Sequence, residues 1–217
     1  MKHILFDLDG TLTDPGVGIT RAAAVALESY GIHVSDLKEL YPFIGPPLAD
    51  SFRRFYGFSP ARAAEAVSRF RAYYREKGIL ENEVYPGMAS FLARLKDAGC
   101  RLYVATSKPE DFSHRVLSRF DLEGYFTDVV GSTYDGSRDT KSAVIACLLQ
   151  RYPSIADGTA LMVGDRKHDV EGAHANGLPA AGVLYGYGSR AEMEACGADY
   201  IVGDLPELER LIVRELP

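Results

Sequence analysis

Short apolar runs, each followed at once by polar residues, constrain the fold of this chain more than any other feature. Three runs are clear, at 3–6, 101–105 and 160–163, and two are weaker, at 126–130 and 180–184. Runs of this length that are rich in β-branched and aromatic residues are typical of strands buried on both faces of a parallel sheet. Helical patterns lie between them, at 88–98, 109–120, 140–151 and 167–176. The alternation predicts right-handed βαβ crossovers and an α/β fold with a doubly wound parallel sheet.

One long stretch, 15–84, interrupts this alternation. It has helical patterns at 16–30 and 48–56 and no convincing buried strand. Ser59 and Pro60 then provide an N-cap and a first-turn proline for a long helix that ends at Gly78. We therefore expect residues 1–14 and 85–217 to form the α/β core, and residues 15–84 to form a small all-helical domain inserted after the first strand.

Length and composition limit the class of protein. The 217 residues are 47% apolar and 25% charged, an ordinary mix for a globular protein, and the formal charge of −6 gives no reason to expect nucleic acid or an acidic membrane as partner. No run approaches the ~20 apolar residues of a membrane span, and the first residues lack a signal-peptide pattern. Three widely spaced cysteines fit reduced thiols. We expect a cytoplasmic protein.

Four aspartates follow two of the predicted strands. Asp7 and Asp9 come after the first strand and point the same way if the chain there is extended, while Asp165 and Asp169 come after the third clear run. Ligands of open α/β sheets bind at this carboxyl edge. Close carboxylates repel unless they share a cation or a proton, and Mg²⁺ suits such oxygen ligands. The alternatives are an Asp-rich turn and a solvated helix end.

Further polar groups follow the other strands. Gly10 allows the chain to turn sharply after Asp9. Thr106 and Ser107 follow the second clear run just before a helix, where hydroxyl and N–H groups can hold phosphate oxygens or simply cap the helix. Lys141 opens the helix after the weaker run 126–130, where a surface lysine is the alternative. The glycine-rich run Tyr185-Gly186-Tyr187-Gly188 is interpreted mainly as a connector.

Together, and in this order, these motifs resemble those of the haloacid dehalogenase superfamily over residues 1–204. The motifs are Asp7-x-Asp9-Gly10-Thr11, Thr106, Lys141 and Gly164-Asp165-x-x-x-Asp169. The inserted helices resemble the helical cap of the phosphoglycolate phosphatase-like branch. Segment 43–48 with Ser51-Phe52 is similar to members described as 5′-nucleotidase-like or phosphoglycolate phosphatase-like, and segment 136–138 resembles the nucleotidase-like group. Lys141 is followed by Ser142-Ala143 instead of the Lys-Pro-x-Pro pattern of many phosphoglycolate phosphatases, so both substrate classes stay open.

The resemblance implies a phosphatase that works through an aspartyl-phosphate on Asp7, with Asp9 as general acid and base. It implies Mg²⁺ held by Asp7, the backbone carbonyl of Asp9 and Asp165, with Asp169 orienting this shell. The groups expected to hold the transferring phosphoryl oxygens are Gly10, Thr106, Ser107 and Lys141. Arg53, on a basic helix of the insertion, is a candidate for steering phosphate, with a solvated helix face as the alternative.

The expected substrate is a small phosphorylated metabolite or a nucleotide, and the expected state is a monomer or a homodimer. A dehalogenase is disfavoured, because the resemblance implies that such enzymes lack the second aspartate of the Asp7-x-Asp9 pair. A phosphomutase of the β-phosphoglucomutase type keeps both aspartates and stays open, as does a phosphotyrosine phosphatase. A non-enzymatic phospho-receiver module is a more distant alternative, since receivers lack the helical insertion.

Overall fold

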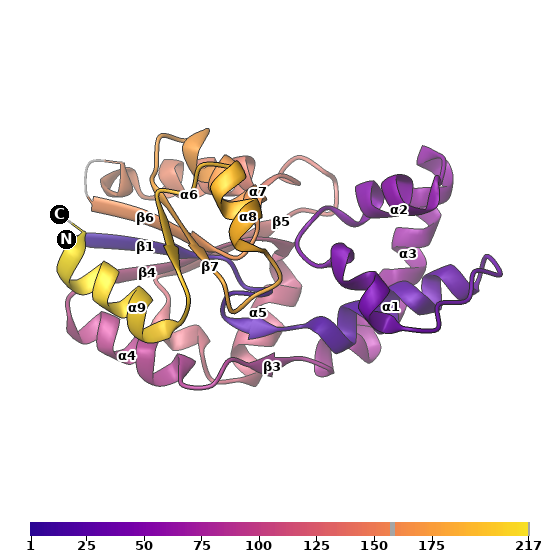
Figure 1. Cartoon of the computed structure of the whole chain (residues 1–217), viewed down its shortest axis with the longest axis horizontal. Helices are drawn as coiled ribbons and strands as arrows, with labels where there is room; N and C mark the ends of the chain where they lie inside the picture. Colours follow the sequence, from indigo (N-terminus) through magenta and orange to yellow (C-terminus); the bar gives the residue numbers. More distant parts are fainter. Residues whose placement is uncertain (157–158, 217) are drawn as a thin grey trace. The chain divides into compact units, whose positions relative to one another are not determined.

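The computed structural model describes residues 1–156 and 159–216 and consists of two compact units. The first unit comprises Met1–Thr13 and Val84–Pro217, and the second comprises Asp14–Glu83. The chain passes between them at β2 (Thr13–Asp14) and β3 (Glu83–Val84), which pair as a small two-stranded sheet. The second unit is therefore an insertion within the first (Figure 1).

A six-stranded parallel sheet organises the first unit, in the order β5-β4-β1-β6-β7-β8. Its strands are β1 (Lys2–Phe6), β4 (Arg101–Pro109), β5 (Asp128–Ser132), β6 (Thr159–Gly164), β7 (Ala180–Val183) and β8 (Tyr200–Val202). The chain runs outward from β1 to β4 and β5, then returns to β6 and runs the other way. The strand order thus reverses beside β1 and β6, the point at which doubly wound sheets bind ligands. The predicted α/β class is confirmed.

Helices cover both faces of this sheet (Figure 1). They are α4 (Met88–Asp97), α5 (Glu110–Arg119), α6 (Lys141–Arg151), α7 (Lys167–His174), α8 (Arg190–Ala195) and α9 (Leu205–Arg210). Shorter 3₁₀ turns lie at Glu123–Tyr125 and Pro153–Ile155, with a π-helical turn at Leu211–Glu215. In Figure 1, α6, α7 and α8 lie on one side of the sheet and α4 and α9 on the other. Fully buried Leu5, Met162 and Val144 belong to the core under α6 and α7.

Three predictions about strands need correction. Strand β5 begins at Asp128, two residues later than predicted, and the short edge strand β8 was not predicted. Strand β4 continues to Pro109, because its register against β5 shifts between Ala105 and Pro109 and Pro109 pairs with Ser132. Residues 106–108 therefore lie within the strand, just before α5 as the sequence predicts.

The second unit is helical, as its sequence pattern predicts. It contains α1 (Gly16–Glu28), α2 (Leu48–Tyr56) and α3 (Pro60–Glu76), with 3₁₀ turns at Leu37–Phe43 and Gly78–Leu80. The Ser59 side chain caps α3 by accepting from the Arg62 N–H at 3.3 Å, which is the N-cap that the sequence predicts. Helix α1 packs on α3, and buried Phe43 and Phe52 meet edge to face beside them.

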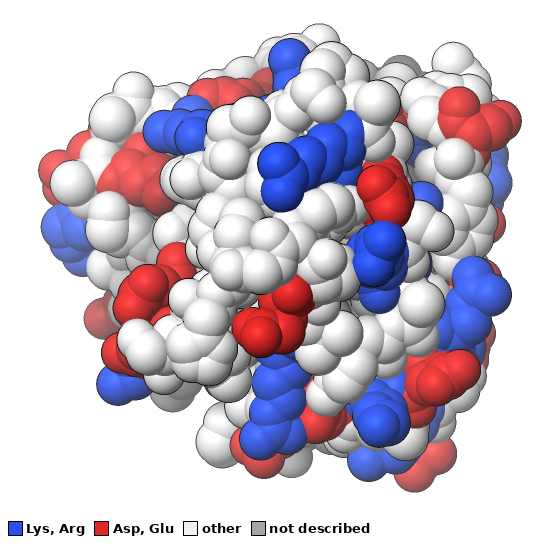
Figure 2. Space-filling model, turned by 90° about the vertical axis from the view of Figure 1, so that its right-hand side faces the viewer, with Lys and Arg blue, Asp and Glu red and all other residues white. Residues whose placement is uncertain are grey.

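Charged side chains of both signs are interspersed on the face drawn in Figure 2. Among the described residues, opposite charges pair within the helical unit, as between Arg69 and Glu65 at 2.7 Å. None of the helices in the described segments combines the length and the apolar character that a membrane crossing needs.

The central position of β1 predicts a large cost for truncating its core side chain. Leu5 is fully buried between the sheet and its helices, so Leu5→Ala leaves a cavity and should lower the free energy of unfolding by about 2–5 kcal/mol. Val213, which is 40% exposed, is the control, and Val213→Ala should cost less than about 0.5 kcal/mol. Urea denaturation followed by circular dichroism measures both values. Equal losses in the two variants would contradict this packing.

Candidate active site

A tight turn after β1 presents the first two aspartates. Asp7 follows the last residue of β1 and is tied to the sheet by its N–H, which donates to the Val163 carbonyl at 2.9 Å. The N–H groups of Leu12 and Thr13 both donate to the Leu8 carbonyl, at 2.9 and 3.0 Å, and close the turn. Gly10 occupies a left-handed conformation there, with φ of +84°. The side chains of Asp7 and Asp9 are consequently buried at the carboxyl end of β1.

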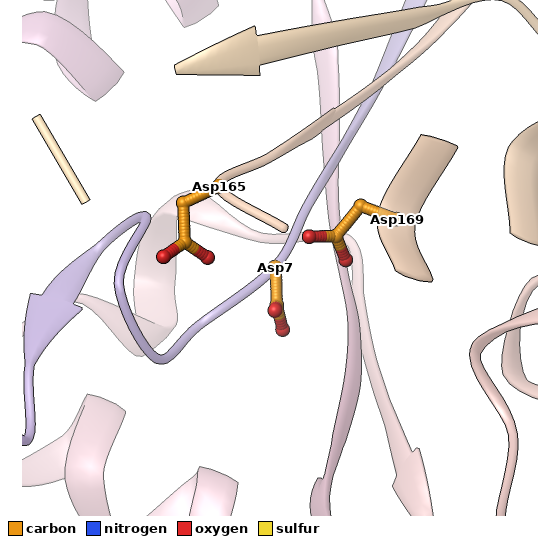
Figure 3. Close-up of side chains that lie close together, drawn as sticks. All are labelled: Asp7, Asp165 and Asp169. Carbon is orange, nitrogen blue, oxygen red and sulfur yellow. The ribbon is translucent and has the colours of Figure 1, made fainter. Parts of the chain in front are cut away.

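Asp7, Asp165 and Asp169 converge from three segments of the chain (Figure 3). Asp7 follows β1, Asp165 follows β6, and Asp169 lies in the first turn of α7. Each offers one carboxylate oxygen, and these oxygens lie within 4.8 Å of one another. All three side chains are buried, so their negative charges are poorly screened by water.

The acidity of two of these groups reflects that crowding. Burial raises the pKa of Asp165 well above its usual value, and the charges of Asp169 and Asp7 raise it further. Burial also raises the pKa of Asp169, to about 6, against the opposing charge of Lys141. The metal-free cluster therefore resists full ionisation of its carboxyl groups. A bound cation would favour their ionised form.

Lys141 is the cation that joins two of the carboxylates. It is the first residue of α6, and its Nζ lies 2.8 Å from Asp7 Oδ1 and 2.8 Å from Asp169 Oδ1. The same Nζ donates to the Ala105 carbonyl at 2.9 Å. Burial by itself would lower the pKa of Lys141, but Asp169 and Asp7 outweigh burial and raise it. Lys141 is thus a buried, charged part of the site and not a surface lysine.

A second buried lysine holds Asp9. Lys108 Nζ lies 2.8 Å from Asp9 Oδ1 and 2.6 Å from Asp9 Oδ2, so it contacts both carboxylate oxygens. Burial raises the pKa of Asp9 against the charge of this lysine. No role is predicted for Lys108 from the sequence, because it lies 99 positions along the chain from Asp9 and only the extended β4 brings the two together.

The remaining predicted residues lie in different places. Thr106 is buried in β4, where its Oγ1 accepts from the Lys108 N–H at 3.3 Å, and Ser107 beside it is partly exposed. Gly10 lies against Asp165, because a Cβ at Gly10 would overlap that carboxylate. Arg53 belongs to α2 in the helical unit, where its guanidinium lies 3.6 Å from Asp50. The roles given to these residues stay predictions.

The donor set fits a divalent metal ion. Asp165 Oδ2 accepts from the Tyr187 N–H at 2.7 Å, whereas Asp165 Oδ1 is buried and has no hydrogen-bond partner among the described residues. The carboxylates of Asp7, Asp165 and Asp169 share one ammonium group, that of Lys141, and a 2+ ion would offset the remaining two negative charges. Hard divalent cations bind such oxygen ligands.

Comparison with known proteins identifies relatives over nearly the whole chain. The family model described as haloacid dehalogenase-like hydrolase matches residues 4–183. A 5′-nucleotidase of Pseudomonas aeruginosa is 44% identical over 210 residues, which make up 97% of this chain and 95% of that protein. The crystal structure of a predicted phosphatase from Clostridium acetobutylicum is 45% identical, covers 98% of both chains and superimposes with a TM-score of 0.95.

Another relative is named as a kinase and not as a phosphatase. The tyrosine-protein kinase PtkA of Mycobacterium tuberculosis is 39% identical over 185 residues, which are 85% of this chain and 62% of that protein. The present chain therefore spans less than two thirds of that relative's length.

The buried position of Lys141 predicts a large stability effect. Lys141→Met removes a cation held between Asp7 and Asp169 and should lower the free energy of unfolding of the metal-free protein by about 3–5 kcal/mol. Arg151→Met breaks an exposed ion pair with Asp128 and should cost less than about 1 kcal/mol. Urea denaturation in the presence of a chelator compares the two variants. A loss for Lys141→Met no greater than that for Arg151→Met would mean that Lys141 does not stabilise the cluster.

Proposed function

This chain belongs to the haloacid dehalogenase-like hydrolases and is a phosphatase of that family, and we propose that it hydrolyses a small phosphomonoester through an aspartyl-phosphate on Asp7. The observation that carries the proposal is the placement of Asp7. Its carboxylate is buried at the sheet edge, lies against Lys141 and shares a cluster with Asp165 and Asp169. A carboxylate in that position can act as a nucleophile on phosphorus while neighbouring cations offset the charge of the phosphate.

The proposed substrate is a 5′-nucleotide. The 44% identity to a 5′-nucleotidase over almost the full length of both proteins supports this choice. Segment 136–138, which resembles the nucleotidase-like group, supports it further. Phosphoglycolate is the runner-up, supported by the resemblance of the helical insertion and by relatives named phosphoglycolate phosphatase.

In the first half of the proposed reaction, a carboxylate oxygen of Asp7 attacks the phosphorus. The new bond joins Asp7 to phosphorus, and the bond between phosphorus and the alcohol oxygen breaks. Asp9, whose side chain is held by Lys108, gives its proton to the departing oxygen, so that an alcohol leaves. Lys141, the Thr106 hydroxyl and the Ser107 N–H donate to the oxygens of the transferring group.

In the second half, water attacks the phosphorus and gives a proton to Asp9. The bond between Asp7 and phosphorus breaks, inorganic phosphate leaves, and Asp7 returns to its ionised form. Asp9 therefore serves first as acid and then as base, and ends each cycle protonated as it began. The net reaction consumes one water for each ester bond.

The metal proposed for this site is Mg²⁺. Asp7, the backbone carbonyl of Asp9 and Asp165 would hold it, and Asp169 would orient this shell through Lys141. When bound, Mg²⁺ supplies positive charge that offsets the carboxylates and the phosphate.

The helical unit is proposed to select the substrate, because the core site recognises the phosphoryl group alone. Arg53 on α2 is the candidate for steering the substrate phosphate. A phosphomutase would use the same core residues and differs in returning the phosphoryl group to its substrate. The relationship to a 5′-nucleotidase favours hydrolysis over that alternative.

The first test of this function is Asp7→Asn. Wild-type protein should release inorganic phosphate from p-nitrophenyl phosphate and from members of a panel of 5′-nucleotides, phosphoglycolate, sugar phosphates and phosphotyrosine. An amide is a poor nucleophile, so Asp7→Asn should lower turnover at least about 10⁴-fold. Asp128→Asn, which changes an aspartate at the far edge of the sheet, should leave turnover unchanged. Retained turnover in purified Asp7→Asn would refute the covalent mechanism.

Asp9→Asn tests the acid and base. Alkyl phosphates need a proton on the leaving oxygen, whereas p-nitrophenolate leaves without one. The variant should therefore lose about 10²–10⁴-fold on a nucleotide. With p-nitrophenyl phosphate the phosphoenzyme should form and then hydrolyse slowly, which gives a burst of p-nitrophenolate in stopped-flow kinetics. Equal losses on both substrates with no burst would exclude Asp9 from this role.

A second candidate function is transfer of a phosphoryl group to a protein tyrosine, which the name of the PtkA relative supports. The panel of phosphomonoesters used to test Asp7→Asn distinguishes phosphoryl transfer from hydrolysis. Labelling of a tyrosine from radioactive ATP, without release of phosphate from any monoester, would favour transfer over hydrolysis.

A further inference from the structure

The glycine-rich loop 185–188, which follows β7, lies against the proposed metal ligand Asp165. The Tyr187 N–H donates to Asp165 Oδ2 at 2.7 Å. A Cβ at Gly186 would overlap the side chain of Asp165 and the carbonyl oxygen of Gly10. A Cβ at Gly188 would overlap the backbone carbonyl of Asp165. The loop therefore contacts both the carboxylate and the backbone of one residue.

Glycine is required at positions 186 and 188 because there is no room for a side chain, and not because of the backbone conformation. Neither Gly186 nor Gly188 has φ in the left-handed region, so alanine could adopt the same backbone. The close approach of Asp165 and Gly10 to Gly186, and of Asp165 and Met193 to Gly188, excludes a side chain. A loop of this composition would be mobile if it served only as a connector, but here it is packed against the site.

Tyr185 anchors the loop at its other end. Its hydroxyl donates to the Thr11 carbonyl at 3.0 Å, so it is attached to the turn that carries Asp7 and Asp9. The ring of Tyr85 packs edge to face on Tyr185, with 5.0 Å between ring centroids, and the Tyr85 N–H donates to the Leu12 carbonyl at 3.4 Å. The loop thus joins the turn after β1 to the residue that follows β6.

We propose that loop 185–188 is the positioning element for Asp165. It holds Oδ2 through the Tyr187 N–H and, by steric contact at Gly186, fixes the carboxylate so that the unpartnered, buried Oδ1 stays available to a cation. This inference rests on the proposed function, because it assumes that Asp165 binds metal. Some residues contact a metal ligand and orient it without binding the metal themselves. Their substitution typically changes metal affinity about 10–100-fold.

Calorimetric titration of Mg²⁺ into the metal-free, full-length protein tests the proposal. Gly186→Ala should weaken Mg²⁺ binding at least about tenfold while circular dichroism remains that of the wild type. Phosphatase activity in this variant should return as Mg²⁺ is raised, since the carboxylate is displaced and not removed. Asp165→Ala, which lacks the proposed carboxylate ligand, provides the reference for full loss of Mg²⁺ binding by this residue. Gly124→Ala is the matched control, because a Cβ there meets no described atom within 4 Å and Gly124 has no left-handed φ.

Each outcome decides the proposal. A folded Gly186→Ala that binds Mg²⁺ as tightly as Gly124→Ala overturns it, and the proposed function then stands if the wild type binds Mg²⁺ and hydrolyses phosphomonoesters. If Gly186→Ala does not fold, Tyr185→Phe decides, because it keeps the ring and removes the hydrogen bond to Thr11. Weaker Mg²⁺ binding by Tyr185→Phe supports the proposal, and unchanged binding overturns it. A wild type that binds no Mg²⁺ overturns both the inference and the metal in the proposed function.

Discussion

Four aspartates buried at one edge of a parallel sheet repel one another, and the other groups of the site are arranged to offset that repulsion. Lys141 lies between two of them and Lys108 contacts both oxygens of a third. Backbone N–H groups add to this, since Leu8 donates to Asp7, Arg166 to Asp169 and Tyr187 to Asp165. Each carboxylate is thereby fixed in direction before any ligand arrives, which is the preorganisation that charge-stabilising sites need.

The charged side chains of the site are packed so closely that several neighbouring positions have no room for a side chain. Gly164 lies against the Asp169 carboxylate, and Gly172 on α7 lies against the stem of Lys141. At both positions a Cβ would occupy space that a charged side chain already fills. The glycines of the site therefore make room for the charged side chains. Among those discussed, only Gly10 is also required by its backbone conformation.

The parts of this site that the sequence predicts lie just after strands or at the starts of the helices that follow them. Asp7, Asp165 and Lys141 are adjacent to ends of secondary structure, and parallel strands bring such ends to one edge, so a linear pattern suffices. The pairing of Lys108 with Asp9 depends on the register of β4 against its neighbours, which leaves no local trace in the chain. The packing of loop 185–188 is equally invisible, because a glycine needed for close contact looks the same in a sequence as a glycine in a free linker. The edge strand β8 was missed because three residues between turns give too short a pattern.

Insertion of the helical unit at paired strands has a consequence for how such a protein can change over time. The chain leaves the core in β2 and re-enters in β3, and these two strands are neighbours, so the ends of the insertion are held next to each other. Segments whose ends lie close together can be lengthened, shortened or replaced without disturbing the rest of a fold. The sheet register that assembles the four aspartates belongs entirely to the other unit. Exchange of the insertion could therefore alter which molecules are recognised while the chemistry at the sheet edge is inherited unchanged.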